Sequence, residues 1–121
     1  MRVVIIEDEH LSQRYLIYLL SIYYPSFEIV AVIKSVDESI KWLSNNSVDL
    51  IFMDITLSDG NCMGILDAID LNSQIIFTTA YVDVDFLNTR LTDYYLLHKP
   101  ISEKEFNNTM NSILTNKGLY N

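Results

Sequence analysis

Carboxylates, a hydroxyl and a lysine each follow a separate apolar run of this sequence. Glu7 and Asp8 come after the first run, Asp54 after the third, Thr79 after the fourth and Lys99 after the fifth. Carboxylates that lie close together repel one another, and their pKa values rise unless a cation neutralises them. A hard divalent cation such as Mg²⁺ suits such a cluster, and a Mg²⁺ that keeps part of its water can accept a phosphoryl oxygen as a further ligand. Together these residues could therefore hold a metal ion and a phosphoryl group.

These side chains meet only if the apolar runs are neighbouring strands of one parallel sheet. The runs are continuous rather than alternating and are rich in Ile and Val, which is typical of strands that are buried on both faces. They cover Val3–Ile6, Ile29–Ile33, Leu50–Met53, Ile75–Phe77 and Tyr94–Leu97. In an open α/β sheet, ligands bind beyond the carboxyl ends of the strands, which is where the polar residues fall.

Segments with helical periodicity alternate with these runs. Helices are expected over His10–Tyr24, Met63–Leu71 and Val82–Leu91. Two further helices are expected to begin after the capping boxes at Ser35 and Ser102. The first helix is expected to bury the stripe Leu11, Tyr15, Tyr18, Leu19 and Ile22, and the last to bury Phe106, Met110, Ile113 and Leu114. Five repeats of strand and helix predict an α/β fold with right-handed crossovers and a doubly wound parallel sheet.

Composition narrows the class of protein. The 121 residues, half of them apolar, suffice for one domain, so residues 1–121 are predicted to form a single domain, complete or the N-terminal part of a longer protein. A formal net charge of −8 argues against binding to nucleic acid or to anionic membranes. The single cysteine, Cys62, and the lack of a long apolar segment favour a cytoplasmic protein.

The ordered set of motifs resembles the receiver domain of response regulators, the phosphoacceptor part of two-component signalling. The resemblance rests on the acidic pair Glu7-Asp8, on Asp54, on Thr79-Ala80 and on Lys99-Pro100, and it runs from Val3 to about Leu114. It implies a flavodoxin-like (βα)₅ fold with strand order 2-1-3-4-5. The stretches 54–60 and 77–81 are most similar to receivers that precede a LytTR-type DNA-binding domain.

The resemblance also implies a role for each site residue. Asp54 would accept a phosphoryl group from the phosphohistidine of a sensor histidine kinase. Mg²⁺ would be bound by Asp8, Asp54, the backbone carbonyl of Thr56, and Glu7 directly or through water. Lys99, which follows a strand and precedes a proline in an expected cis bond, would neutralise phosphoryl oxygens, and the Thr79 hydroxyl would donate to them. Phosphorylation would then switch the face formed by the fourth helix, fifth strand and fifth helix, and homodimerisation could follow.

Several positions depart from the family pattern. Glu7 replaces the more common Asp, Ser58 a common Pro, and Cys62 a common Gly, while Leu96 stands where an aromatic switch residue is usual. Tyr81, Tyr94 or Tyr95 could take over the switch, and Tyr81 could also shield the phosphoryl group from water. The aromatic residues of the expected switch face either form a readout surface or fill the core; they are Phe86, Tyr94, Tyr95 and Phe106.

Two other functions are compatible with the sequence. A pseudo-receiver would keep the fold as an interaction module without accepting phosphate, as the departures at Glu7 and Leu96 allow. A haloacid-dehalogenase-type phosphohydrolase also uses an Asp after an apolar strand, but it carries a second Asp two residues later, where this chain has Thr56.

Overall fold

The computed structural model describes residues 1–81 and 83–116, and they form a parallel five-stranded sheet covered on both faces. The strands of the sheet are β1 (Arg2–Ile6), β2 (Glu28–Ile33), β3 (Leu50–Asp54), β6 (Gln74–Thr79) and β7 (Tyr95–His98). Their order across the sheet is β2-β1-β3-β6-β7. Counted along the chain, these five strands follow the predicted order 2-1-3-4-5. All five predicted strands are confirmed, and no strand end differs from the prediction by more than two residues.

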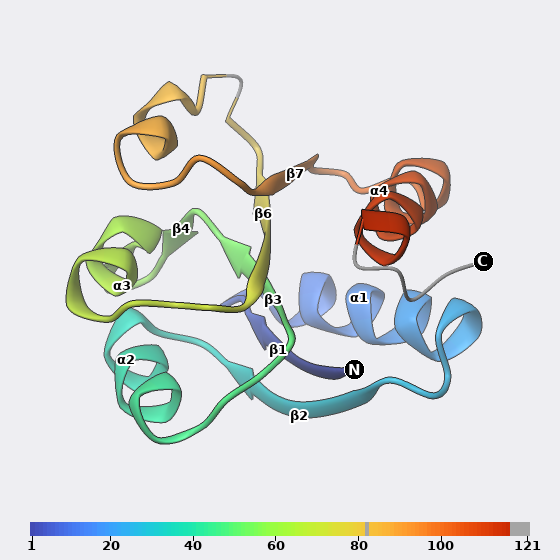
Figure 1. Ribbon diagram of the computed structural model, residues 1–121, viewed down its shortest axis with the longest axis horizontal. Helices are drawn as coiled ribbons and strands as arrows, with labels where there is room; N and C mark the ends of the chain where they lie inside the picture. Colours follow the sequence, from blue (N-terminus) through green and yellow to red (C-terminus); the bar gives the residue numbers. More distant parts are fainter. Residues whose placement is uncertain (82, 117–121) are drawn as a thin grey trace.

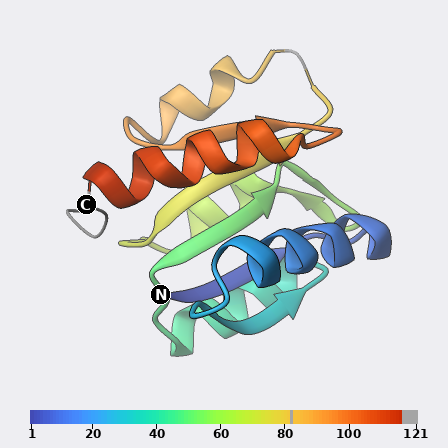
Figure 2. The ribbon, with the colours of Figure 1, turned by 90° about the vertical axis from the view of Figure 1, so that its right-hand side faces the viewer.

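Helices pack on the two faces of the sheet (Figure 1). On one face lie α1 (His10–Tyr23) and α4 (Glu103–Asn116), which Figure 2 shows in front of the strands. On the other face lie α2 (Val36–Asn45), α3 (Cys62–Ala68) and the 3₁₀ helix η1 (Asp85–Thr89). The sheet therefore separates two apolar cores, one centred on residues such as Met53 and Ile65, the other on Phe52 and Phe106.

The two predicted capping residues fix where α2 and α4 begin. The Ser35 hydroxyl accepts a hydrogen bond from the Glu38 amide at 3.1 Å, and the Ser102 hydroxyl accepts one from the Glu105 amide at 3.0 Å. Each hydroxyl satisfies an amide that the helix itself leaves without a partner. Phe106, Met110, Ile113 and Leu114 are buried along α4, as the periodicity predicts.

The predicted buried face of α1 is wrong for three residues. Leu11, Tyr18 and Ile22 are exposed, and the face turned to the sheet carries Gln13, Leu16, Leu19 and Leu20. This helix is apolar on more than one side, so its hydrophobic period does not by itself define the inner face. Leu19 belongs to both stripes, and Tyr15 packs against the edge of the core.

Two connections differ from a regular (βα)₅ pattern. Where a helix over Val82–Leu91 was predicted, the described residues contain only the short 3₁₀ helix η1, and Val82 lies outside them. After β3, a small antiparallel ribbon forms from β4 (Thr56–Leu57) and β5 (Gly60–Asn61), so α3 begins at Cys62 and ends at Ala68 instead of Leu71. Among the described residues, no helix is long and apolar enough to cross a membrane.

Candidate functional site

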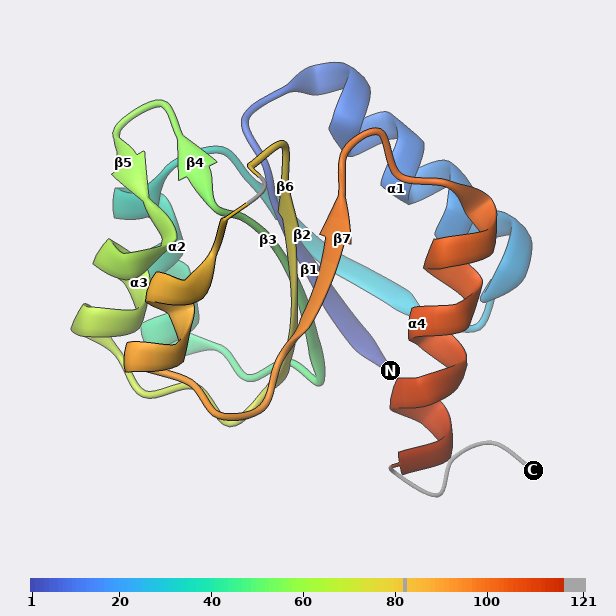
Figure 3. The ribbon, with the colours of Figure 1, turned by 90° about the horizontal axis from the view of Figure 1, so that it is seen from above.

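The ends of three strands bring the candidate residues to one edge of the sheet, at the top of Figure 3. Glu7 follows β1, Asp54 ends β3 and Lys99 follows β7. Main-chain hydrogen bonds continue the sheet past these ends: the Glu7 amide donates to the Ile33 carbonyl at 2.9 Å, and the Lys99 amide donates to the Thr79 carbonyl at 2.7 Å. The predicted convergence of these side chains is therefore built into the backbone.

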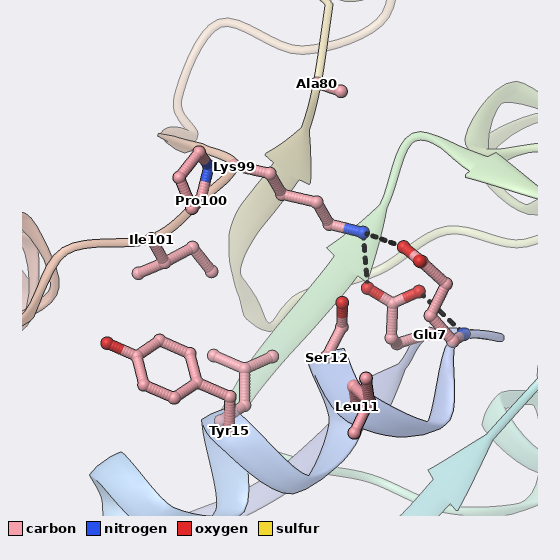
Figure 4. A pocket seen from close by; sticks show the side chains of 10 residues that line it. Glu7, Leu11, Ser12, Tyr15, Ala80, Lys99, Pro100 and Ile101 are labelled. Atoms are coloured by element: carbon pink, nitrogen blue, oxygen red, sulfur yellow. Dashed lines mark hydrogen bonds and ion pairs between the residues drawn. The ribbon is translucent and has the colours of Figure 1, made fainter.

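The Lys99 ammonium lies among three carboxylates. Its Nζ donates to Glu7 Oε1 at 2.6 Å, to Asp54 Oδ2 at 2.9 Å and to Glu9 Oε1 at 3.2 Å. Figure 4 shows the Lys99 side chain extending across the site toward Glu7. Three carboxylates surround one ammonium group, an arrangement that favours a further cation.

Burial decides the electrostatics of Glu7, which is 1% exposed. Loss of hydration raises the pKa of Glu7 from 4.5 to about 7, although hydrogen bonds from Lys99 and from the Glu9 amide oppose the rise. Burial alone would lower the pKa of Lys99, but its hydrogen bonds to Glu7 and Asp54 outweigh that effect and hold the pKa above its ordinary value. Lys99 is therefore charged, and Glu7 exchanges its proton near neutral pH.

Asp54 is held by both of its carboxylate oxygens. Oδ2 accepts from Lys99, and Oδ1 accepts from the Thr56 amide at 3.1 Å. Thr79 is 1% exposed, and its hydroxyl oxygen accepts a hydrogen bond from the Tyr81 amide at 2.9 Å. Thr56, Thr79 and Tyr81 all line a cavity of about 320 Å³ beside Asp54, and Tyr81 is itself exposed at its rim.

The oxygen atoms present suit a hard cation. Carboxylate oxygens of Glu7, Glu9 and Asp54 lie within 4.8 Å of one another. Asp8 is half-buried and lines the same cavity as Asp54, although it does not belong to this closest group of three. Mg²⁺ prefers oxygen ligands from one or two carboxylates together with water and phosphate, so the donor set fits the ion.

Two residues that hold the site were not predicted. Glu9 adds a third carboxylate to Lys99, and Gln13 donates from Nε2 to the Glu7 carbonyl at 2.6 Å inside the protein. Glu9 follows the acidic pair directly, which was the available signal. Gln13 had no such signal in the sequence, because its side-chain amide reaches the Glu7 carbonyl only from the face of α1 that the periodicity did not predict to be buried.

A second, larger cavity adjoins the site. It measures about 610 Å³ and lies between the first turns of α1 and the segment that joins β7 to α4. Figure 4 shows Leu11, Tyr15 and Ile101 around it, with Lys99 and Glu7 at one end. The site is therefore open toward α1 through a mainly apolar recess.

The positions that depart from the family pattern have defined surroundings. Cys62 is fully buried at the start of α3, and burial raises the pKa of its thiol to about 12. Leu96 is half-buried and packs against the core that contains Met53. The Lys99–Pro100 bond is cis, as predicted.

The aromatic residues of the expected switch face separate into core and surface. Phe106 is fully buried, with its ring centroid 6.1 Å from that of Phe52, so of the two alternatives it fills the core, as the periodicity of the last helix predicts. Tyr94 and Tyr95 are half-buried and contact opposite cores, and Phe86 is 38% exposed. Phe86 is therefore the most accessible of the four.

Comparisons with known proteins agree with this geometry. Residues 3–111 match the family model of the response regulator receiver domain. The chain is 32% identical to the transcriptional regulatory protein LytR of Staphylococcus aureus over 122 aligned residues, covering 97% of the chain and 48% of LytR. It is 31% identical to protein MrkE of Klebsiella pneumoniae, covering 95% of the chain and 44% of MrkE. The chain thus spans about half the length of these relatives.

Solved structures share the fold. The crystal structure of the response regulatory domain of MrkE from Klebsiella pneumoniae matches with a TM-score of 0.78 and 29% identity, covering 95% of this chain and 96% of that one. A complex described as CheX-CheY-BeF3-Mg from Borrelia burgdorferi matches with a TM-score of 0.81, covering 94% of this chain and 89% of that one, at 18% identity. With the family model, the relatives and the arrangement of strand ends in agreement, this chain belongs to the response regulator receiver domain family of two-component signalling.

Proposed function

We propose that this receiver domain accepts a phosphoryl group on Asp54 from the phosphohistidine of a sensor histidine kinase. The observation that carries the proposal is the Lys99 ammonium, which binds Asp54 Oδ2 at 2.9 Å and Glu7 Oε1 at 2.6 Å. This contact places a positive charge beside the carboxylate that would react. Phosphoryl transfer depends mainly on positioning and on neutralising spread charge, so such a contact is what the reaction needs.

In the proposed step, an oxygen of the Asp54 carboxylate attacks phosphorus as the nitrogen–phosphorus bond of the phosphohistidine breaks. The imidazole leaves with the electron pair of that bond, and an aspartyl phosphate forms. Lys99 stays protonated, because its pKa is raised, and binds phosphoryl oxygens. Thr79, which lines the same cavity, donates a hydrogen bond from its hydroxyl group to a phosphoryl oxygen.

Mg²⁺ is part of the proposal. The ion would be held by Asp8, Asp54, the backbone carbonyl of Thr56, and Glu7 directly or through water. Glu9 would join them, because its carboxylate lies close to those of Glu7 and Asp54. The ion would neutralise charge on the phosphoryl oxygens. The surplus of carboxylates over ammonium groups supports this part of the proposal.

The proposal extends to the setting of the domain. We propose that residues 1–121 belong to one receiver domain and, since the relatives are about twice as long, that a further domain carries the output. We propose a cytoplasmic location, where a single buried thiol stays reduced. Phosphorylation would alter the face made by η1, β7 and α4 and favour a homodimer, while the acidic charge keeps this chain away from nucleic acid.

Incubation with a small phosphodonor and Mg²⁺, followed by intact-mass measurement, tests the proposal. We expect a one-phosphoryl adduct on the wild-type chain, and no adduct on Asp54→Ala or in the presence of a chelator. The exposed Asp93→Ala serves as the matched control and keeps the adduct. A wild-type chain that forms no adduct is a pseudo-receiver, and one that releases many equivalents of phosphate is a phosphohydrolase; either result refutes the proposal.

A further inference from the structure

The two-stranded ribbon of β4 and β5 connects β3, the strand that ends in Asp54, to α3. Thr56 pairs with Asn61 and Leu57 pairs with Gly60, and the Cys62 amide closes the base of the ribbon on the Ile55 carbonyl at 2.9 Å. Thr56 also donates to Asp54 Oδ1 and lines the acidic cavity. The position of the ribbon therefore determines where the Thr56 backbone lies beside Asp54.

The tip of the ribbon is bonded to a different helix. The Asp59 carboxylate accepts the Val36 amide at 2.8 Å through Oδ1 and the Asp37 amide at 3.2 Å through Oδ2. Both amides belong to the first turn of α2, where a helix leaves its amides without partners. These two bonds lower the pKa of Asp59, so the carboxylate is ionised and suited to the positive end of the helix dipole.

Close packing adds a second contact between α2 and this region. A Cβ atom at Gly64 would lie 3.1 Å from Val36 Cγ1, and one at Gly60 would lie 3.5 Å from Val36 Cγ2. Gly60 also has a φ of +151°, which favours glycine. Val36 thus packs against both the ribbon and α3, beside the bonds that Asp59 makes.

We propose that Asp59 is a positioning residue that fixes the ribbon to α2 and thereby holds the Thr56 backbone at the metal and phosphoryl site. The inference rests on the proposed function for its link to Mg²⁺, but the fixing of the ribbon is a property of the fold alone. Residues that orient metal ligands from outside the coordination sphere typically change metal affinity by about 10- to 100-fold when they are mutated. Asp59 acts through two backbone amides of a helix rather than through a ligand side chain, so we expect the lower end of that range.

Backbone amide hydrogen exchange in metal-free protein tests the fixing of the ribbon. In Asp59→Ala, the Thr56 and Cys62 amides should exchange severalfold faster than in the wild type, because both bonds to α2 are lost. Asp59→Asn keeps one carbonyl oxygen as an acceptor and should restore part of the protection. Asp37→Asn is the matched control. It removes one negative charge from the first turn of α2, which contains the amides bonded to Asp59, and the Asp37 carboxylate pairs with Lys41 and not with the ribbon.

Calorimetric titration with Mg²⁺ tests the link to the site. We expect Asp59→Ala to weaken Mg²⁺ binding about tenfold, Asp59→Asn to weaken it less, and Asp37→Asn to stay within twofold of the wild type. Unchanged exchange in Asp59→Ala, or equal acceleration in Asp37→Asn, would overturn the proposal, and faster exchange with unchanged Mg²⁺ affinity would overturn its link to the site. If the wild type binds no Mg²⁺, the proposed function fails, whereas the exchange rates still decide whether Asp59 fixes the ribbon.

Discussion

Replacing Glu7 by glutamine is expected to stabilise the metal-free protein at alkaline pH. Glu7 is buried beside Asp54, and both carboxylates share the Lys99 ammonium. Burial raises the pKa of Glu7 from 4.5 to about 7, so the folded chain keeps a proton that the unfolded chain has released. The stability that this proton provides is complete below about pH 4.5, is lost as the pH rises to about 7, and changes no further above that.

The size of the loss follows from the shift in pKa. At about 1.4 kcal/mol per pKa unit, a rise from 4.5 to about 7 corresponds to about 3 kcal/mol in the free energy of unfolding. A glutamine at position 7 resembles the protonated acid and does not ionise, so Glu7→Gln should escape this loss. Glutamine also offers one carbonyl oxygen in place of the two carboxylate oxygens that accept from Lys99 and from the Glu9 amide, but that cost does not depend on pH.

Urea unfolding of both proteins in a chelator at pH 5 and pH 8 measures the effect. We expect the stability of Glu7→Gln relative to wild type to be more favourable at pH 8 than at pH 5 by about 2–3 kcal/mol. Glu9→Gln replaces a side chain that is 65% exposed; it is the control and should show no such change. Equal pH dependence in wild type and Glu7→Gln would show that Glu7 does not titrate as a buried acid, and the reasoning would be wrong.

Four other substitutions give distinct outcomes. Lys99→Ala removes the ammonium group from beside two buried carboxylates, and it should lower the free energy of unfolding in urea by about 3 kcal/mol at pH 8. The loss should be much smaller at pH 5, where Glu7 accepts a proton. An equal loss at both pH values would show that Lys99 does not stabilise these carboxylates by its charge. Tyr81→Ala should hydrolyse its aspartyl phosphate severalfold faster, as followed by intact mass, because Tyr81 lines the cavity beside Asp54; an unchanged rate would remove its shielding role. Phe106→Ala should cost about 3–5 kcal/mol in urea unfolding because Phe106 is fully buried, whereas Phe86→Ala should cost less than about 1 kcal/mol; similar losses would contradict the assignment of core and surface.

The main sheet could be predicted because its strands are buried on both faces. Continuous apolar runs such as Leu50–Met53 have few other stable environments in a chain of this size. Capping residues were equally local: a hydroxyl at Ser35 can satisfy the Glu38 amide without reference to the rest of the fold. Elements that depend on such short-range chemistry, or on uniform burial, were therefore recovered from the sequence.

Elements that depend on tertiary contacts were not recovered. The inner face of α1 is decided by the sheet and by the Glu7 carbonyl, which bonds Gln13, and not by the apolar period of the helix. At the tip of the ribbon after Asp54, Asp59 accepts hydrogen bonds from amides of α2 that lie more than twenty residues away in sequence. Separations of that length carry no local signal, since each partner alone is an ordinary loop or helix residue.

The convergence of Glu7, Asp54 and Lys99 lies between these cases. Each residue ends a strand or directly follows one, so the strand order and the parallel direction are enough to bring them to one edge. What the topology does not give is the balance of charge among them. The structure adds Glu9 and leaves three carboxylates around one ammonium, with Glu7 half protonated near neutral pH.

A second cation beside Glu7 would favour its ionised form and lower its pKa. We therefore expect Mg²⁺ binding to release protons near pH 7, and calorimetric titration in buffers of different ionisation enthalpy would detect this. Mg²⁺ binding without proton release would mean that Glu7 is already ionised in the metal-free protein.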